Sequence, residues 1–301
     1  MTVRLRVTIA IVAVILVANC ALSLVTVLYL GRIWLDEVQT RVSLNLGAAR
    51  TVYNERVREI ALFISGLSFN RQLPGGLKGP EWGNKQLLSA GMYQSSGLDF
   101  LTLLDAQGRV VLRAHNPEVH GDDLSSNLLV SQALQQRALV KGTVIVQRDM
   151  LARDGEQFLA RARFDSPDAP GTQPNAQQAR ENGMVMGAAT PVVDDHGELV
   201  GVLFGGYLLN RSYELVDTIR DQVFGNQLFD GVPVGTVTIF QDDLRISTNV
   251  LLSDGARAVG TRLRTEVYEQ VVQGGQTWAG PTQVLDHWYI TAYDLLRDLE
   301  G

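Results

Sequence analysis

The sequence contains a single cysteine, Cys20, which lies in an apolar run near the N-terminus. The rest of the chain therefore has no disulfide and no thiol nucleophile. Three catalytic signatures are also absent from the sequence: the G-x-S-x-G elbow, the H-E-x-x-H zinc motif and the phosphate-binding loop. We therefore expect no catalytic activity, no catalytic residue and no cofactor in these 301 residues.

Positive charge is also scarce. The chain has 26 lysines and arginines against 32 aspartates and glutamates, which gives a net charge of −6. A nucleic-acid-binding surface needs an excess of basic residues, so we predict no nucleic-acid partner. The hydrophobic fraction of 46% is enough for one large domain or two small ones.

One long hydrophobic run is present at residues 7–30, which carry no charge. As a helix it would be about 36 Å long, more than the roughly 30 Å of a bilayer core. Arg4 and Arg6 precede it and favour a cytoplasmic N-terminus. We predict a cytoplasmic N-terminus at residues 1–6, a single-pass helix in the inner membrane at 7–30, and a periplasmic location for 31–301. The alternative is a cleavable signal peptide, whose apolar stretch would be shorter.

Helical periodicity continues directly after this run. Between residues 31 and 70, apolar residues such as Leu35, Val38 and Val42 recur at steps of three or four. We predict one long amphipathic helix that is continuous with the membrane segment. A helix of this length needs a partner surface. That surface is either its own domain or a second copy in a homodimer, and both can hold together.

The rest of the chain repeats one plan of strands and helices. The first unit, residues 84–209, contains a short helix, two strands, a helix, a strand and a long hairpin, predicted at 84–94, 98–115, 125–137, 142–147 and 184–209. A strand is also predicted at 156–165, and a loop without periodicity at 166–183. A linking helix in 210–233 leads to a second unit, residues 234–301. This unit repeats the hairpin at 234–250, the helix at 265–275 and a strand from 287.

The second unit ends one strand short of the first. We therefore expect the sequence to continue with that strand, a second membrane helix and a cytoplasmic part. The predicted fold class is α+β, with antiparallel sheets.

An N-terminal anchor, a long helix and two such units together resemble the extracytoplasmic double Cache (PAS-like) sensor regions of bacterial histidine kinases and chemoreceptors. The resemblance covers residues 35–301 and is carried by "LDFLTLLDAQGRVVLRAHNPEVHGD", "GTVTIFQDDLRISTNV" and "WYITAYDLLRDLEG". It implies a membrane-distal module at 84–209 and a truncated membrane-proximal module at 234–301. It also implies a small-molecule ligand.

The first of these stretches also resembles the arginine–histidine–proline strand of citrate and C4-dicarboxylate sensor kinases. The resemblance implies that Arg113, or else Arg109, and His115 bind a ligand carboxylate, with Asn116 beside them. Spacing of two residues places Arg113 and His115 on one face of a strand, and a guanidinium offers two parallel donors to a carboxylate. The alternative is that Arg113 pairs with an aspartate at 122 or 123 and that His115 bonds the backbone.

The strand that faces this site departs from the pattern of those kinases. It reads "MGAATP", with small residues where they have cations. In "FLARARFD", Arg161 and Arg163 alternate, so on a strand they would share one face and replace those cations. The alternative is that both arginines point to solvent.

Two further groups of residues have structural explanations. His115, His120 and the acidic residues between 118 and 123 match no common metal template, and acidic residues are frequent where a helix begins. We therefore predict no metal site. Trp278, Trp288 and Tyr289 are expected to be core aromatics.

Together these features predict the ligand-sensing region of a transmembrane receptor that binds a small, anionic organic ligand. A sensor histidine kinase is the first expectation for the output and a chemoreceptor the second. Any kinase activity would lie outside these 301 residues. A membrane-anchored scaffold without a small ligand is the alternative of a different class.

Overall fold

The computed structural model describes residues 3–70, 72–78, 90–165, 171–173, 179–225, 228–229, 232–285 and 287–299. Side chains of the first helix are described for residues 15–27, 29–30 and 33–68. Part of the short helix predicted at 84–94 and most of the loop predicted at 166–183 lie outside these ranges. So do residues 1–2 of the predicted cytoplasmic N-terminus.

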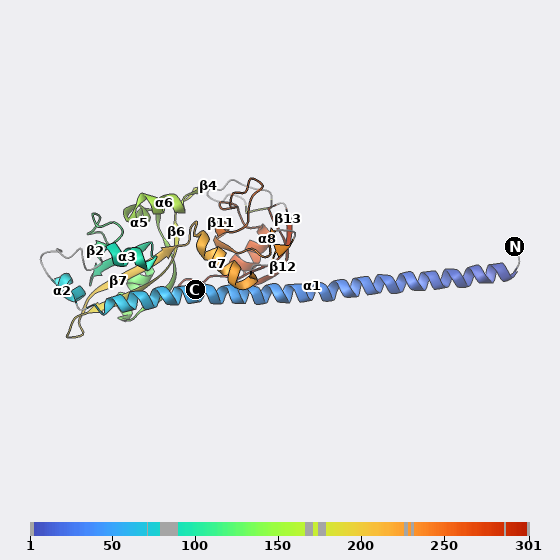
Figure 1. The fold of residues 1–301 in the computed structure, drawn as a ribbon, viewed down its shortest axis with the longest axis horizontal. Helices are drawn as coiled ribbons and strands as arrows, with labels where there is room; N and C mark the ends of the chain where they lie inside the picture. The colour runs from blue at the N-terminus through green and yellow to red at the C-terminus, as the bar shows by residue number, and fades with distance from the viewer. Residues whose placement is uncertain are drawn as a thin grey trace.

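The first helix, α1 (Val3–Ser68), runs without interruption from the apolar run into the amphipathic stretch. Both groups of strands lie along one side of its C-terminal half, whereas its N-terminal half extends away from them (Figure 1). The buried residues of α1 are Tyr53, Val57, Ile60, Ala61 and Ile64. They stand at i, i+4, i+7, i+8 and i+11, which is one face of a helix, and this confirms the predicted long helix and its apolar stripe.

The prediction of a membrane-spanning segment at 7–30 is not confirmed. Within the described part of the chain, no helix has an apolar stretch of the length and hydropathy needed to cross a bilayer. Residues 7–14 of the predicted segment lie outside the described side chains.

Short helices and strands make up the rest of the fold. The other described helices are α2 (Gln72–Lys78), α3 (Ala90–Ser96), α4 (Leu128–Gln136), α5 (Arg148–Asp154), α6 (Glu156–Ala162), α7 (Tyr213–Phe224), α8 (Thr265–Tyr268) and the π-helix η1 (Glu269–Gln273). The longer strands are β1 (Phe100–Asp105), β2 (Val110–Arg113), β3 (Val140–Val146), β6 (Gly183–Val193), β7 (Leu199–Leu208), β10 (Thr238–Gln241), β11 (Leu244–Thr248), β12 (Trp278–Val284) and β13 (His287–Tyr293). Two-residue strands are β4 (Phe164–Asp165), β5 (Ala179–Arg180), β8 (Leu228–Phe229) and β9 (Val232–Pro233).

The first group of strands forms a five-stranded antiparallel sheet in the order β2-β1-β7-β6-β3. One face packs on α1, because alternate residues such as Leu101, Leu103 and Met186 share a core with Ile64. The other face carries Phe100 and Leu104, among others, and is covered by α4, α5 and α6. The predicted hairpins of the first unit and its helix near 125–137 are confirmed.

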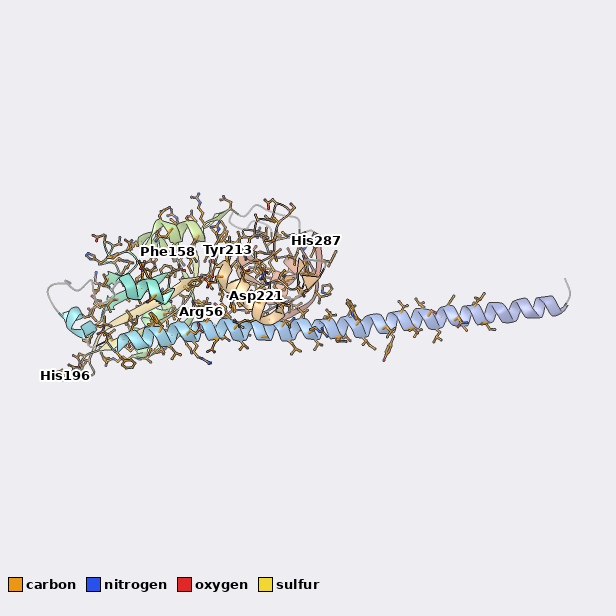
Figure 2. All side chains as sticks on the ribbon, in the orientation of Figure 1. Arg56, Phe158, His196, Tyr213, Asp221 and His287 are labelled. Carbon is orange, nitrogen blue, oxygen red and sulfur yellow. The ribbon has the colours of Figure 1, made fainter. Side chains whose placement is uncertain are left out.

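The second group of strands forms two separate antiparallel pairs, β10-β11 and β12-β13. Both β12 and β13 contact α1, and α7 packs between α1 and β11. Figure 2 shows the two groups side by side along α1, with His196 at the tip of the β6–β7 hairpin and His287 in the second group. The predicted α+β class with antiparallel sheets is confirmed.

One local prediction was wrong. The strand expected at 156–165 is mostly helix α6, whose buried residues Phe158, Leu159 and Ala162 follow a helical spacing. Gln72–Lys78 forms a further short helix, α2, after the end of α1. Pro74 lies in its first turn, where a missing backbone N–H costs little.

Candidate functional site

Arg113, at the end of β2, is completely buried in a closed cluster of acids. Its Nη1 and Nη2 donate to the two carboxylate oxygens of Asp122 at 2.7 and 2.8 Å. Its Nε donates to Asp154 at 2.8 Å, and Nη1 also donates to the carbonyl of Val119 at 2.9 Å. The alternative that Arg113 pairs with Asp122 is therefore confirmed.

The charges of this cluster stabilise one another. Burial alone would lower the pKa of Arg113, but hydrogen bonds and charge interactions with Asp122 and Asp154 outweigh it and raise that pKa. The hydrogen bonds from Arg113 hold the pKa of Asp122 below its ordinary value. Both groups therefore stay ionised at neutral pH. Their charges are satisfied inside the protein.

His115 belongs to the same cluster. Its Nδ1 accepts a hydrogen bond from the backbone N–H of Leu101 at 3.3 Å, and its Nε2 lies 3.1 Å from Asp154. Since Nδ1 accepts, the network assigns the proton to Nε2, which donates to the carboxylate. The rings of Tyr93, Phe100 and Phe158 surround the imidazole.

The other three predicted ligand residues also have partners within the chain. Asn116 donates to the carbonyl of Arg153 at 2.9 Å. Arg161, on α6, donates to Asp99 at 2.7 Å and to two backbone carbonyls at the end of β7. The side chain of Arg163 is 65% exposed and lies 3.6 Å from Glu181.

The structure thus brings Arg113, His115 and Asn116 together at the corner between α5 and α6. It does not bring Arg161 and Arg163 to them. A cavity of about 10 Å³ lies beside this cluster and is lined by Asp154 and Phe100 among others. That volume holds about one water molecule, so this cavity is too small for a metabolite.

A much larger cavity, of about 710 Å³, lies between α1 and the second group of strands. Its volume is within the usual range for small-molecule sites. One wall is the face of α1 from Val42 to Tyr53, and the others come from α7, β3, β10 and β13. Most of its surface is apolar.

Arg245, on β11, also lines this cavity and is only 4% exposed. Its neighbours Leu244 and Ile246 join the core beneath α1, so its side chain lies on the opposite face of the strand. There the guanidinium lies 5.3 Å from the ring centroid of Phe240, which packs with Tyr293. Within the described residues, Nε and Nη1 of Arg245 have no hydrogen-bond partner.

Other charged residues in the wall of the cavity have a partner of opposite charge, whereas Arg245 has none among the described residues. Arg50 pairs with Asp294 at 2.6 Å, and Asp242 pairs with Arg180 at 3.0 Å. Burial lowers the pKa of Arg245, and the two nearby tyrosines, Tyr293 and Tyr289, only partly oppose the effect. An arginine nevertheless stays protonated in proteins. The cavity therefore contains a buried cation that no described acid neutralises.

In the sequence, Arg245 lies in the second predicted hairpin, and Arg113 lies in the first. Both hairpins contain a β-bulge, between Leu103 and Leu104 in one and between Ile239 and Phe240 in the other. Measured from these bulges, Arg245 corresponds to Val110, whereas Arg113 corresponds to Thr248. The signal in the sequence was an arginine inside the apolar strand "LRIST". Its significance depends on having no acid opposite, which the sequence does not reveal.

The cluster around His115 and His120 was also considered as a metal site. Within the described ranges, no three histidine, cysteine, aspartate or glutamate side chains are gathered as ligands for a metal ion. Asp122 instead accepts hydrogen bonds from Arg113. Asp123 accepts a hydrogen bond from the backbone N–H of Ser125 at 2.8 Å.

Comparison with known proteins identifies a Cache region in this chain. The family model of single Cache domain 3 matches residues 207–301. This match confirms the resemblance to Cache sensor regions that the sequence predicted. It covers the second group of strands, which forms most of the wall of the large cavity. No curated protein matches the chain.

Several solved structures are similar to the chain at low identity. The periplasmic domain of Vibrio cholerae LuxQ is 11% identical, with 83% of this chain and 96% of that chain covered and a TM-score of 0.42. The ligand-binding domain of the Campylobacter jejuni chemoreceptor Tlp3, in complex with L-valine, is 9% identical, with coverages of 86% and 87% and a TM-score of 0.42. The Pseudomonas aeruginosa chemoreceptor PctC, in complex with GABA, is 14% identical, with coverages of 84% and 89% and a TM-score of 0.37.

Proposed function

With a Cache region at residues 207–301 as the premise, we propose that the chain is the ligand-sensing region of a signal-transduction receptor. We further propose that it binds a small organic anion in the cavity beside Arg245. The observation that carries this proposal is a buried guanidinium without an acidic partner in an apolar cavity of about 710 Å³. An isolated buried charge is costly unless a ligand or partner compensates it.

The wall of the cavity indicates the class of ligand. A carboxylate would accept two parallel hydrogen bonds from the guanidinium of Arg245. The aromatic rings of Phe240 and Tyr293 beside it suit an apolar or planar body. Tyr53, whose hydroxyl lies 2.6 Å from that of Thr143, closes the cavity on the side of α1. We therefore propose an organic acid with one carboxylate near Arg245 and a compact apolar part.

The location of the cavity also supports a role in signalling. Because α1 forms one of its walls, a bound ligand would favour the position of α1 that makes the best contacts with it. The helix would then transmit the change along its axis. We propose a location outside the cytoplasm, a homodimer through α1, and a histidine kinase as the output, with a chemoreceptor as the second choice.

Thermal unfolding in the presence of small acids tests the binding proposal. Monocarboxylates of increasing apolar size should raise the melting temperature of the full chain in a concentration-dependent way. The matching carboxamides, which lack the charge, should not. Arg245→Met should remove the effect, whereas Arg109→Met, at an exposed arginine of the other group of strands, should leave it intact.

The same experiment separates the two candidate sites. If His115→Gln removes the response and Arg245→Met does not, the ligand binds at the cluster around Arg113. A response that survives both substitutions would also contradict binding at Arg245. Circular dichroism of each variant confirms that the fold is retained.

A further inference from the structure

The acids in the wall of the large cavity already have hydrogen-bond donors within the chain. Among the described residues these acids are Asp242, Asp294 and Asp298. Oδ2 of Asp294 accepts a hydrogen bond from Nη1 of Arg50, on α1, at 2.6 Å. Its Oδ1 accepts one from the next backbone N–H at 2.9 Å and one from the hydroxyl of Thr277 at 3.4 Å. Both carboxylate oxygens of Asp294 are therefore occupied.

The other two acids also have partners. Oδ2 of Asp242 accepts a hydrogen bond from Nη1 of Arg180, on β5, at 3.0 Å, and the hydroxyl of Tyr268 is bonded to the same side chain. Asp298 interacts with another group of the chain. In the described part of the wall, no acid is therefore free to bind a positively charged group of a ligand.

The cations of the same wall differ from the acids in one member. Arg50 is paired with Asp294, and Arg297 also has an interaction within the chain. Arg245 is the exception, because its buried Nε and Nη1 have no partner among the described residues. The described wall therefore offers one cation without a partner and no acid without a partner. A ligand with a single negative charge balances it.

Ligands with a second charge fit this balance less well. The ammonium group of an amino acid would enter a wall whose described acids are occupied and which already holds the guanidinium of Arg245. The second carboxylate of a dicarboxylate would need another free cation, and both Arg50 and Arg297 are engaged. A charge that leaves water without gaining a partner weakens binding. The described wall thus favours an anion with one charge.

The cavity reaches the surface of the protein at Tyr289. This residue lines the cavity and is 40% exposed, and the adjacent Trp288 is 73% exposed. The expectation that both are core aromatics was therefore wrong. Because this wall is open to water, a ligand enters from its hydrated state. The ammonium group of an amino acid would lose its water shell in the cavity and gain no described acid in return.

We infer that the cavity selects monocarboxylates and rejects both amino acids and dicarboxylates, with Arg50 as the residue that determines the rejection of amino acids. The inference rests on the proposed function, since it specifies the ligand of the same cavity. Specificity can arise from charges left unpaired in the wrong complex as well as from contacts in the right one. Arg50 acts in this way because it occupies Asp294, the acid that would otherwise receive an ammonium group.

Isothermal titration calorimetry of the full chain with four compounds on one carbon scaffold tests the selection. Pentanoate is compared with L-2-aminopentanoate and 5-aminopentanoate, which add an ammonium group at either end, and with pentanedioate, which adds a second carboxylate. We expect pentanoate to bind at least about tenfold more tightly than each of the other three.

The outcomes separate the inference from the proposed function. An amino acid or dicarboxylate that binds as tightly as pentanoate, and whose binding Arg245→Met abolishes, would overturn the inference while the proposed function stands. If such binding survives Arg245→Met, both are wrong. If none of the four compounds binds, the proposed function fails and the inference fails with it.

Releasing Asp294 provides the complementary test. Arg50→Met should raise the affinity for at least one of the two amino acids by about tenfold, because the carboxylate then lacks its cation. Adding Asp294→Asn to the same chain should remove this gain. Unchanged amino-acid affinity in a folded Arg50→Met chain would contradict the role of Arg50.

A matched control and a second variant complete the experiment. Arg58→Met removes another arginine of α1, which pairs with Glu55 at 3.1 Å and lies outside the described wall of the cavity, so all four affinities should stay unchanged. Arg180→Met releases Asp242 as Arg50→Met releases Asp294, and it replaces that variant if Arg50→Met does not fold. Circular dichroism of each variant shows whether the fold is retained.

Discussion

Arg113 and Arg245, two of the three arginines that are buried in the described part of the chain, have opposite environments. Arg113 donates to two carboxylates and a carbonyl, and the cavity beside its cluster has a volume of only about 10 Å³. Arg245 is almost equally buried, yet its Nε and Nη1 have no described partner in a cavity of about 710 Å³. Burial of a cation therefore does not by itself identify a binding site. What distinguishes the two arginines is whether an acid neutralises the buried charge, and this difference is the reason for placing the proposed site at Arg245.

The largest effect is expected from Arg113→Met. Loss of the guanidinium leaves the buried Asp154 without a counter-charge and leaves Asp122 with only the exposed Arg153 at 3.4 Å, so the free energy of unfolding should fall by about 3–5 kcal/mol. Urea denaturation measures the change. The control is Arg109→Met at an exposed position of the same hairpin, which should change stability by less than about 0.5 kcal/mol. A small loss for both variants would contradict the closed cluster.

The opposite sign is expected for Arg245→Met in the ligand-free protein. Methionine keeps much of the volume and removes an uncompensated buried charge, so unfolding should require about 2–4 kcal/mol more. The melting temperature and urea midpoint should both rise. Arg245→Lys retains a charge at this position and should give no such gain. Destabilisation by Arg245→Met would show that the guanidinium has a partner in the native protein.

A third expectation compares the packed face of α1 with its open face. Gly205→Ala should destabilise the chain by about 1–3 kcal/mol, because the new methyl group would overlap buried Ile64. Gly66→Ala is the control: an added Cβ there meets nothing within 4 Å. Since alanine favours a helix over glycine, that variant should gain about 0.5–1 kcal/mol. Urea denaturation of both variants checks the pair.

The smallest effect concerns pH. The pKa of Asp122 is lower in the folded chain than its unfolded value of about 3.9. Its ionised form therefore stabilises the fold above that value, and this stability is lost as the pH falls through the depressed folded pKa. Asp122→Asn should cost about 1–2 kcal/mol near neutral pH and progressively less below about pH 4. Urea unfolding across this range measures the difference, and a cost that is constant with pH would contradict the charge pairing.

Much of the fold could be predicted from the sequence, because local signals and tertiary packing agree. The hairpin at 98–115 combines alternating apolar residues with a turn at Asp105–Gly108, and its backbone pairs as expected. Even so, the start of α4 differs slightly. The helix begins at Leu128 rather than at residue 125, and Asn127 caps it by accepting hydrogen bonds from the backbone N–H groups of Leu129 and Val130.

Other parts required the tertiary structure. In "FLARARFD" the same residues satisfy a strand pattern and a short helix pattern, so packing of Phe158 and Leu159 decides between them. The candidate site was only partly predictable for a related reason. The sequence identified Arg113 and His115 by chemical type. Their shared partner, Asp154, lies on α5, far along the chain, so the sequence could not show that both side chains are already hydrogen-bonded to it. The importance of Arg245 rests on a cavity whose walls come from α1, α7, β3, β10 and β13, which are far apart in the sequence.

The contact of α1 with both groups of strands has a thermodynamic consequence. A single rigid helix forms part of the core of the first sheet and one wall of the large cavity. If a ligand favours one position of α1 at the cavity, that preference is also imposed on the packing at Ile64. Linkage is reciprocal, so a substitution at the first sheet that shifts α1 must change the ligand affinity by the same free energy. The affinity of the cavity is therefore a property of the whole chain.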